Sequence, residues 1–299
     1  MHTRQKNRKG DLKMPTVRKL TISACAFLIV SLLSGVGYAG PADKTIPENK
    51  ATREFKAGAI SGQIMIRSGV PMAGGMVYFF NDTAGPPPSI SKYWRVPSES
   101  ASIDSNGRFS AELDEGYYYM GAIKRISGGP LGPPQDGDYY FLSQDEKGKP
   151  KLHSVKKGET TDIGIVSEVR PFRNSMLAKR GVTAIEGTVL DAKSRPLEGV
   201  MVYAFVTNTL VGRPLFVSDR TGKDGRYLLR VAGGGTYFLR VRNNYGGGAP
   251  AKGDIIGAYG EGGPEGVDVK TGEVRKGIDI MAMVFPGRGP RKEEALTLK

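Results

Sequence analysis

One pattern of apolar and polar positions occurs twice in the chain. Residues 59–80 and 184–205 align without a gap and are identical at nine of 22 positions. In each copy, a run of strand length (60–66 or 185–190) ends in a proline-containing turn cluster and is followed by a second run. The repeat therefore predicts the same first pair of strands in two modules.

The second run of each copy indicates how its strand packs. In residues 199–205, alternation places Met201, Tyr203 and Phe205 on one face, and the other face takes Val200, Val202 and Ala204. Both faces are thus apolar. This is typical of a sheet that is covered on both sides, as in a sandwich.

The similarity resumes further along both copies. Asn106-Gly107 and Asp224-Gly225 are strong hairpin signals, because a tight turn needs residues that tolerate positive φ. Alternating runs and a glycine turn follow in each copy, and neither copy shows sustained helical spacing. We therefore predict an all-β fold of two tandem antiparallel β-sandwiches with about seven strands each.

The N-terminus has the pattern of a signal peptide. Seven basic residues precede a short apolar run, Ile22–Leu33, and small residues then lead to Ala39. We expect residues 1–39 to be removed by cleavage after Ala39, and no membrane span in the mature chain. An uncleaved membrane anchor and a start at Met14 remain alternatives.

Composition shifts divide the rest of the chain. We expect a polar leader at 40–56, a first module at 57–170, a basic linker at 171–181 with at most one helical turn, a second module at 182–286 and a charged tail at 287–299.

Cysteine and charge narrow the function classes. Cys25 is the only cysteine and lies in the signal segment, so the mature chain has no disulfide, thiolate metal site or cysteine nucleophile. The formal charge of +13 falls to +7 without residues 1–39, and the remaining charge is scattered. We expect no nucleic-acid partner.

Four stretches of the second copy carry a family resemblance: residues 185–189, 196–200, 221–227 and 235–239. On these residues the copy resembles the bacterial carboxypeptidase regulatory-like domain, a transthyretin-like β-sandwich. The first copy is a degenerate version of it. The resemblance implies an accessory module of secreted or cell-envelope proteins, and it implies no catalytic residues.

Isolated motifs have simpler explanations than catalysis. We expect His153 to be a surface histidine near a strand end, without a nucleophile and an orienting partner. Ser89-Ile90-Ser91-Lys92 lacks the helical setting of penicillin-recognising enzymes. Asp104–Gly107 and Asp136–Asp138 lack the ligand count of a calcium loop. We therefore predict no catalytic residues, no metal and no cofactor.

Aromatic residues gather on the long segments of the first copy. The candidates for ligand binding are Tyr93, Trp94, Tyr139, Tyr140 and Phe141. Rings on loops at one end of a sandwich stack on sugars or grip a peptide. Alternatively, Trp94 and Tyr140 close the core beneath the loops.

Together these observations predict a periplasmic or extracellular, non-catalytic binding or scaffolding protein of the cell envelope. The expected partner is an envelope protein complex or a surface polysaccharide. Two alternatives remain: a carbohydrate-binding protein that uses the loop rings, and an accessory subunit of an envelope peptidase or hydrolase.

Overall fold

The computed structural model describes residues 57–287, apart from 68, 127–130, 211 and 247. The predicted signal peptide and leader, and the tail from residue 288, lie outside the described residues. The described residues belong to one compact unit. They are all-β, in a sandwich-like arrangement of two sheets, and none of their helices is long and apolar enough to cross a membrane.

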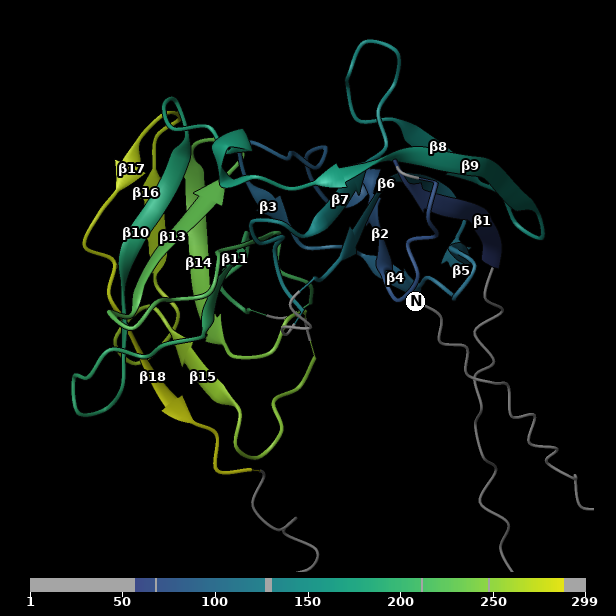
Figure 1. Ribbon diagram of the computed structural model, residues 1–299. Helices are drawn as coiled ribbons and strands as arrows, with labels where there is room; N and C mark the ends of the chain where they lie inside the picture. Colours follow the sequence, from purple (N-terminus) through teal and green to yellow (C-terminus); the bar gives the residue numbers. More distant parts are fainter. Residues whose placement is uncertain (1–56, 68, 127–130, 211, 247, 288–299) are drawn as a thin grey trace, which may run out of the picture. The chain divides into compact units, whose positions relative to one another are not determined.

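Nine strands come from the first half of the chain, coloured purple to teal in Figure 1. They are β1 (Ala57–Ile66), β2 (Met76–Asn81), β3 (Trp94–Arg95), β4 (Glu99–Ser102), β5 (Arg108–Asp114), β6 (Gly116–Lys124), β7 (Tyr139–Leu142), β8 (Leu152–Val155) and β9 (Thr160–Pro171). All but β3 form one sheet, in the order β4-β2-β6-β7-β9-β1-β5, with β8 paired to β6.

Nine further strands come from the second half, which runs from teal to yellow (Figure 1). They are β10 (Thr183–Leu190), β11 (Met201–Phe205), β12 (Phe216–Val217), β13 (Arg226–Val231), β14 (Gly235–Arg242), β15 (Ile255–Ala258), β16 (Gly266–Val269), β17 (Val274–Arg275) and β18 (Ile280–Val284). Their sheet has the order β13-β10-β18-β15-β14-β11-β12-β3, with β16 paired to β14 and β17 to β10. One helical turn, Asn174–Met176, lies between the halves, as the linker predicted.

The duplicated signals form tight turns in both halves, but the predicted hairpins are wrong. The strand after each turn, β5 or β13, pairs with β1 or β10 and not with the strand before the turn. Gly107 and Gly225 have φ values of +78° and +69°. A Cβ at Gly107 would lie 2.6 Å from the carbonyl oxygen of Ile64, and one at Gly225 would lie 2.7 Å from that of Val189. Each glycine thus combines a left-handed conformation with a close backbone approach, and only glycine satisfies both conditions.

Each half encloses its own hydrophobic cluster. Residues from Ile60 to Val169 form the first, and the second runs from Ile185 to Ala282 with the addition of Tyr93. Val200, just before β11, and Val202 and Ala204 within it face the second cluster, as the alternation predicted. Met201, Tyr203 and Phe205 face a third cluster, which residues of both halves build.

The strand count differs from the predicted seven because loops form short strands. β3 lies in the long connection between β2 and β4, and β12 lies in the long connection between β11 and β13. The two segments pair antiparallel, with Trp94 opposite Val217 and Arg95 opposite Phe216. A strand of the first half therefore lies at the edge of the second half's sheet.

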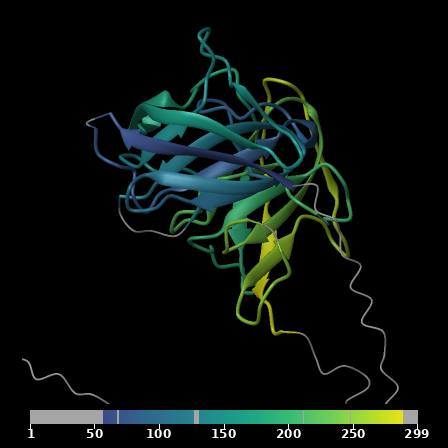
Figure 2. The ribbon, with the colours of Figure 1, turned by 90° about the vertical axis from the view of Figure 1, so that its right-hand side faces the viewer.

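The long strands of the first half, in blue and teal, run beside one another in both views (Figures 1 and 2). β1 pairs antiparallel with β5 and parallel with β9, and β10 pairs likewise with β13 and β18. The two halves thus repeat the same strand neighbours around their first strand.

Candidate functional site

The candidate aromatic residues are not displayed on loops. Exposure is 8% for Tyr93, 8% for Trp94, 9% for Tyr140 and 7% for Phe141, and Tyr139 is half-buried. Exposed stacking rings were therefore the wrong expectation. For Tyr93 and Trp94 the physical reason is the pairing of β3 with β12, and for the other three rings it is their place on β7, which pairs with β6 and β9.

Trp94 and Tyr140 lie instead in the cluster between the halves. The Trp94 ring meets Phe172 edge-on at 5.6 Å between centroids, and Tyr140 meets Phe172 at 6.2 Å. Tyr93 reaches further, packing edge-on against Phe216 at 5.2 Å inside the second core. This matches the alternative in which Trp94 and Tyr140 close the core.

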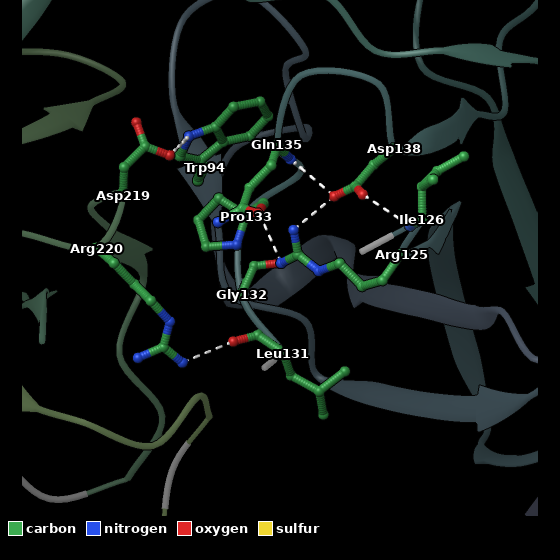
Figure 3. A network of polar contacts seen from close by, with 10 residues as sticks. All are labelled: Trp94, Arg125, Ile126, Leu131, Gly132, Pro133, Gln135, Asp138, Asp219 and Arg220. Atoms are coloured by element: carbon green, nitrogen blue, oxygen red, sulfur yellow. Dashed lines mark hydrogen bonds and ion pairs between the residues drawn. The ribbon is translucent and has the colours of Figure 1, made fainter. Parts of the chain in front are cut away.

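Polar contacts reinforce this contact between the halves, as Figure 3 shows. Trp94 Nε1 donates to Asp219 Oδ1 at 3.1 Å, and Arg220 Nη2 donates to the carbonyl oxygen of Leu131 at 2.9 Å. Both bonds join residues of different halves. The long loop of the first half is thereby held against the segment that follows β12.

A buried ion pair stabilises that loop from within (Figure 3). Arg125 Nη1 lies 2.6 Å from Asp138 Oδ2, with the side chains 11% and 3% exposed. Asp138 also accepts from the backbone N–H groups of Ile126 and Gln135. Arg125 Nη2 donates to the carbonyl oxygens of Gly132 and Pro133. Asp138, predicted to be a loop residue and not a metal ligand, is thus a structural anion.

His153 is not the surface residue that the sequence suggested. It lies on β8 with 8% exposure, and its Nε2 is 2.9 Å from Ser143 Oγ in a hydrogen bond. Burial, and then the charge of Lys151, lowers the pKa of the ring. Both residues line an open hollow of about 880 Å³. Among the described residues, no carboxylate accepts a hydrogen bond from the imidazole to orient it, so the pair lacks the third member of a triad.

The remaining motifs are turns. Asp104 Oδ1 accepts from the N–H groups of Asn106 and Arg108, and Ser89 Oγ accepts from that of Lys92. Asp136 accepts from Asn174 and pairs with Arg173. Within the described ranges, no group of three or more His, Cys, Asp or Glu side chains is placed to hold a metal ion.

A second site is a cleft of about 700 Å³ with a different lining. We call it the arginine cleft. It is lined by Met76, Tyr78, Val96, Pro97, Ser98, Glu99, Ser100, Leu131, Tyr203, Phe205, Leu210, Gly212, Arg213, Pro214, Arg240, Arg242, Tyr245, Gly246, Gly248, Ala249 and Pro250. Its residues come from both halves, so its shape depends on their contact.

The floor of the arginine cleft is one face of the second sheet. Arg240 and Arg242 alternate on β14, so their side chains share a face. Tyr203 on β11 is directly opposite Arg240, and Met201 is opposite Arg242. Burial raises the pKa of Tyr203 to about 12, so its hydroxyl stays protonated. It donates to the carbonyl oxygen of Asn244.

The residues that line the cleft carry more positive than negative charge: three arginines against the carboxylate of Glu99. Arg213 pairs with Glu99 at 2.6 Å on the rim. Arg242 is 6% exposed and lies 3.3 Å from Asp254, but its Nε finds no partner among the described residues. Burial, and then the charge of Arg242, lowers the pKa of Arg240. The cleft therefore favours an anion.

The sequence held a signal for this site that we did not use. Arg240-Val241-Arg242 places two cations on one face of an otherwise apolar strand, whose partner strand presents Met201, Tyr203 and Phe205. Charges rarely lie on a buried sheet face without a partner or a ligand. The cleft itself could not be inferred from this strand, because the wall that faces the two arginines comes from the first half.

Comparison with known proteins gives only distant similarity. No protein-family model matches the chain, and no curated protein matches it. Among solved structures, the chain is similar to the Bacillus anthracis TIE protein at 14% identity, covering 75% of this chain and 34% of that one, with a TM-score of 0.22.

Two other structures are similar at the same level. A streptococcal ancillary pilin is 15% identical over 80% of this chain and 64% of its own, with a TM-score of 0.22. A DUF3823 family protein from Bacteroides uniformis is 13% identical over 77% of this chain and 100% of its own, with a TM-score of 0.24. The chain thus spans a third of the first structure and under two thirds of the second. These similarities are too low to carry an argument about function.

Proposed function

We propose that the protein is a non-catalytic binding protein of the cell envelope, built from two tandem carboxypeptidase regulatory-like β-sandwich modules and exported by its N-terminal signal. The arginine cleft is its binding site. The observation that carries this proposal is the cleft itself, which has an unanswered positive charge and walls from two halves joined by β3.

Three features support a binding role over catalysis. The repeated tight turns, with Gly107 and Gly225 at equivalent positions, agree with two copies of one module. The Ser143–His153 pair has no orienting carboxylate within the described part of the chain. Contacts across the halves, from Trp94–Asp219 to Arg220–Leu131, hold the cleft walls in one arrangement, which lowers the entropy cost of binding.

A polysaccharide partner is the second candidate. It requires exposed rings, and the candidate rings are buried, which disfavours stacking at those positions. Tyr78 and Tyr245 still line the arginine cleft and meet edge-on at 6.4 Å between centroids. In this alternative, these two rings contribute to sugar binding inside the cleft. An accessory role beside an envelope peptidase or hydrolase is compatible with the same cleft.

Site-directed photocrosslinking in intact cells tests the proposal. A photoreactive residue replaces Arg213 on the rim of the cleft, and a matched control replaces Glu112 on the exposed side of β5, away from the cleft lining. We expect defined crosslinked neighbours from the rim position and none of these from the control. Fractionation and N-terminal sequencing of the same sample report compartment and cleavage after Ala39.

The opposing results are equally concrete. Identical crosslinks from both positions, or recovery of the protein in the cytoplasm with its N-terminus intact, contradict the proposal. A glycan array with the mature protein decides the second candidate: binding that Tyr245→Ala abolishes supports a polysaccharide ligand.

A further inference from the structure

The arginine cleft combines two kinds of surface. Arg240 and Arg242 form a cationic floor, and the walls bring apolar side chains, among them Met76, Val96 and Phe205. A volume of about 700 Å³ lies within the range of about 300–1,000 Å³ that is usual for small-ligand sites. A ligand that fills this space needs an anionic group at one end and an apolar body beside it.

Arg240 is the group best placed to receive the anion. Its side chain is half-buried, and its one hydrogen bond among the described residues is a long one, 3.5 Å from Nη1 to the carbonyl oxygen of Leu210. Most of its donors therefore remain open. A guanidinium presents a planar fork that matches the two oxygens of a carboxylate.

Arg242 supplies the second, independent observation. It is 6% exposed, lines the cleft and leaves Nε without a partner in the described part of the chain. Its contact to Asp254, at 3.3 Å, is long for a charge-assisted hydrogen bond. A buried donor without an acceptor is costly, and an anion between Arg240 and Arg242 would give it one.

The charges on the lining restrict the anion. Arg213, the third arginine, is already paired with Glu99 on the rim, and that carboxylate disfavours a large polyanion at the mouth. One anionic group at the floor, with an uncharged remainder, fits this distribution. Leu131 at the mouth is 47% exposed and extends the apolar wall outward.

We infer that the arginine cleft binds a carboxylate carried on an apolar body, with Arg240 and Arg242 as its anion receptor. The C-terminal residues of an apolar peptide and a fatty acid share this chemistry. This inference rests on the proposed binding role of the cleft and specifies the chemical class of its ligand.

Titration of the purified mature protein with dansyl-Gly-Leu-Phe, followed by dansyl fluorescence anisotropy, tests it. The peptide is used with a free carboxylate and as its C-terminal amide. We expect the acid to bind and the amide to bind at least about 10-fold more weakly, since a hydrogen bond to a charged group is lost. Competition with laurate distinguishes the sources: displacement at comparable concentration indicates a lipid-like ligand, and weak displacement favours a peptide.

Variants connect the binding to the proposed residues. Arg240→Gln is expected to weaken acid binding about 10- to 100-fold, whereas Arg240→Lys retains part of it. Leu131→Glu places a negative charge at the mouth and weakens binding without altering the floor. The control is Arg226→Gln, an exposed arginine on β13 paired with Glu186, which should bind as the unmodified protein does.

The inference is overturned if acid and amide bind equally, if Arg240→Gln binds like Arg226→Gln, or if neither probe binds at ~1 mM, the weak end of specific affinity. Loss of binding in correctly folded protein, with the rim crosslinks intact, refutes the ligand class and leaves the binding role. Loss of the crosslinks refutes the binding role itself.

Discussion

Replacing Asp138 removes the negative partner of the most deeply buried ion pair in the loop that faces the second half. The Asp138 side chain is 3% exposed and accepts from Arg125 and from two backbone N–H groups. In Asp138→Ala, all three donors lose their acceptor. Arg125, at 11% exposure, keeps only the carbonyl oxygens of Gly132 and Pro133.

The magnitude follows from these contacts. Breaking a buried ion pair by removing one partner lowers the free energy of unfolding by about 3–5 kcal/mol. The N–H groups of Ile126 and Gln135 belong to exposed residues, so water replaces part of their lost bonds. We therefore expect about 4 kcal/mol for Asp138→Ala. Asp138→Asn keeps one acceptor oxygen, whereas Ile126 donates to Oδ1 and Gln135 and Arg125 donate to Oδ2. It therefore loses the charge and part of the hydrogen bonds, and we expect about 2 kcal/mol.

Urea unfolding followed by the emission of Trp94 measures this effect. Trp94 is the only tryptophan and lies in the cluster between the halves, close to the loop. The midpoint should fall while the denaturant slope stays unchanged. Glu99→Ala is the matched control, because it breaks an ion pair whose side chains are 56% and 51% exposed; we expect about 0–1 kcal/mol.

A double-mutant cycle decides whether the pair is coupled. The double variant Arg125→Met/Asp138→Asn should lose about 1–3 kcal/mol less stability than the sum of the two single variants, because only the double variant leaves no lone buried charge. The reasoning fails if Asp138→Ala costs no more than Glu99→Ala, or if the two substitutions add within about 0.5 kcal/mol.

Three further predictions use other parts of the fold. Trp94 emission should be blue-shifted and poorly quenched by acrylamide, and strong quenching would show that the ring is exposed. Trp94→Phe, which loses the hydrogen bond to Asp219, should lower the free energy of unfolding in urea by about 1–2 kcal/mol. Burial and the charge of Lys151 lower the pKa of His153 below its unfolded value of 6.5, so the unfolded chain takes up the proton more readily. The stability that this residue contributes is complete above about pH 6.5 and falls as the pH drops. His153→Gln should therefore flatten the dependence of the melting temperature on pH between about pH 7 and 5, and an unchanged slope would refute this. Gly225→Ala should lower the free energy of unfolding by about 2 kcal/mol or more, since a Cβ there lies 2.7 Å from a backbone oxygen. Gly199→Ala, with a similar φ of +78° and open space, should lower it by about 1 kcal/mol in the same denaturation experiment. Equal losses would mean that the turn at Gly225 relaxes freely.

Local signals in the sequence predicted the repeated framework well. Asn106-Gly107 and Asp224-Gly225 correctly mark two tight turns, although the strands beside them pair elsewhere, and alternation in β11 correctly assigned Met201, Tyr203 and Phe205 to one face. These features depend on neighbouring residues and on the period of a strand, which a sequence displays directly.

Non-local pairing accounts for what the sequence did not predict. Tyr93 and Trp94 were expected on a loop because nothing near them indicates that β12 is their partner. His153 was expected on the surface, yet β8 places it opposite Tyr118 of β6 and beside Ser143. The arginine cleft requires both halves in contact, so neither repeat predicts it alone.

The pairing of β3 with the sheet of the second half has a consequence for how the chain folds. Trp94 and its hydrogen-bond acceptor, Asp219, are 125 residues apart, so during synthesis this bond cannot form until the whole first half and the second half up to Asp219 have been made. Contacts of such separation form late and slow folding. Copies of a repeated module ordinarily fold separately; here the sheet of the second half ends in a strand of the first, so the second half is not expected to complete its sheet in isolation, whereas the first half's sheet needs only its own strands.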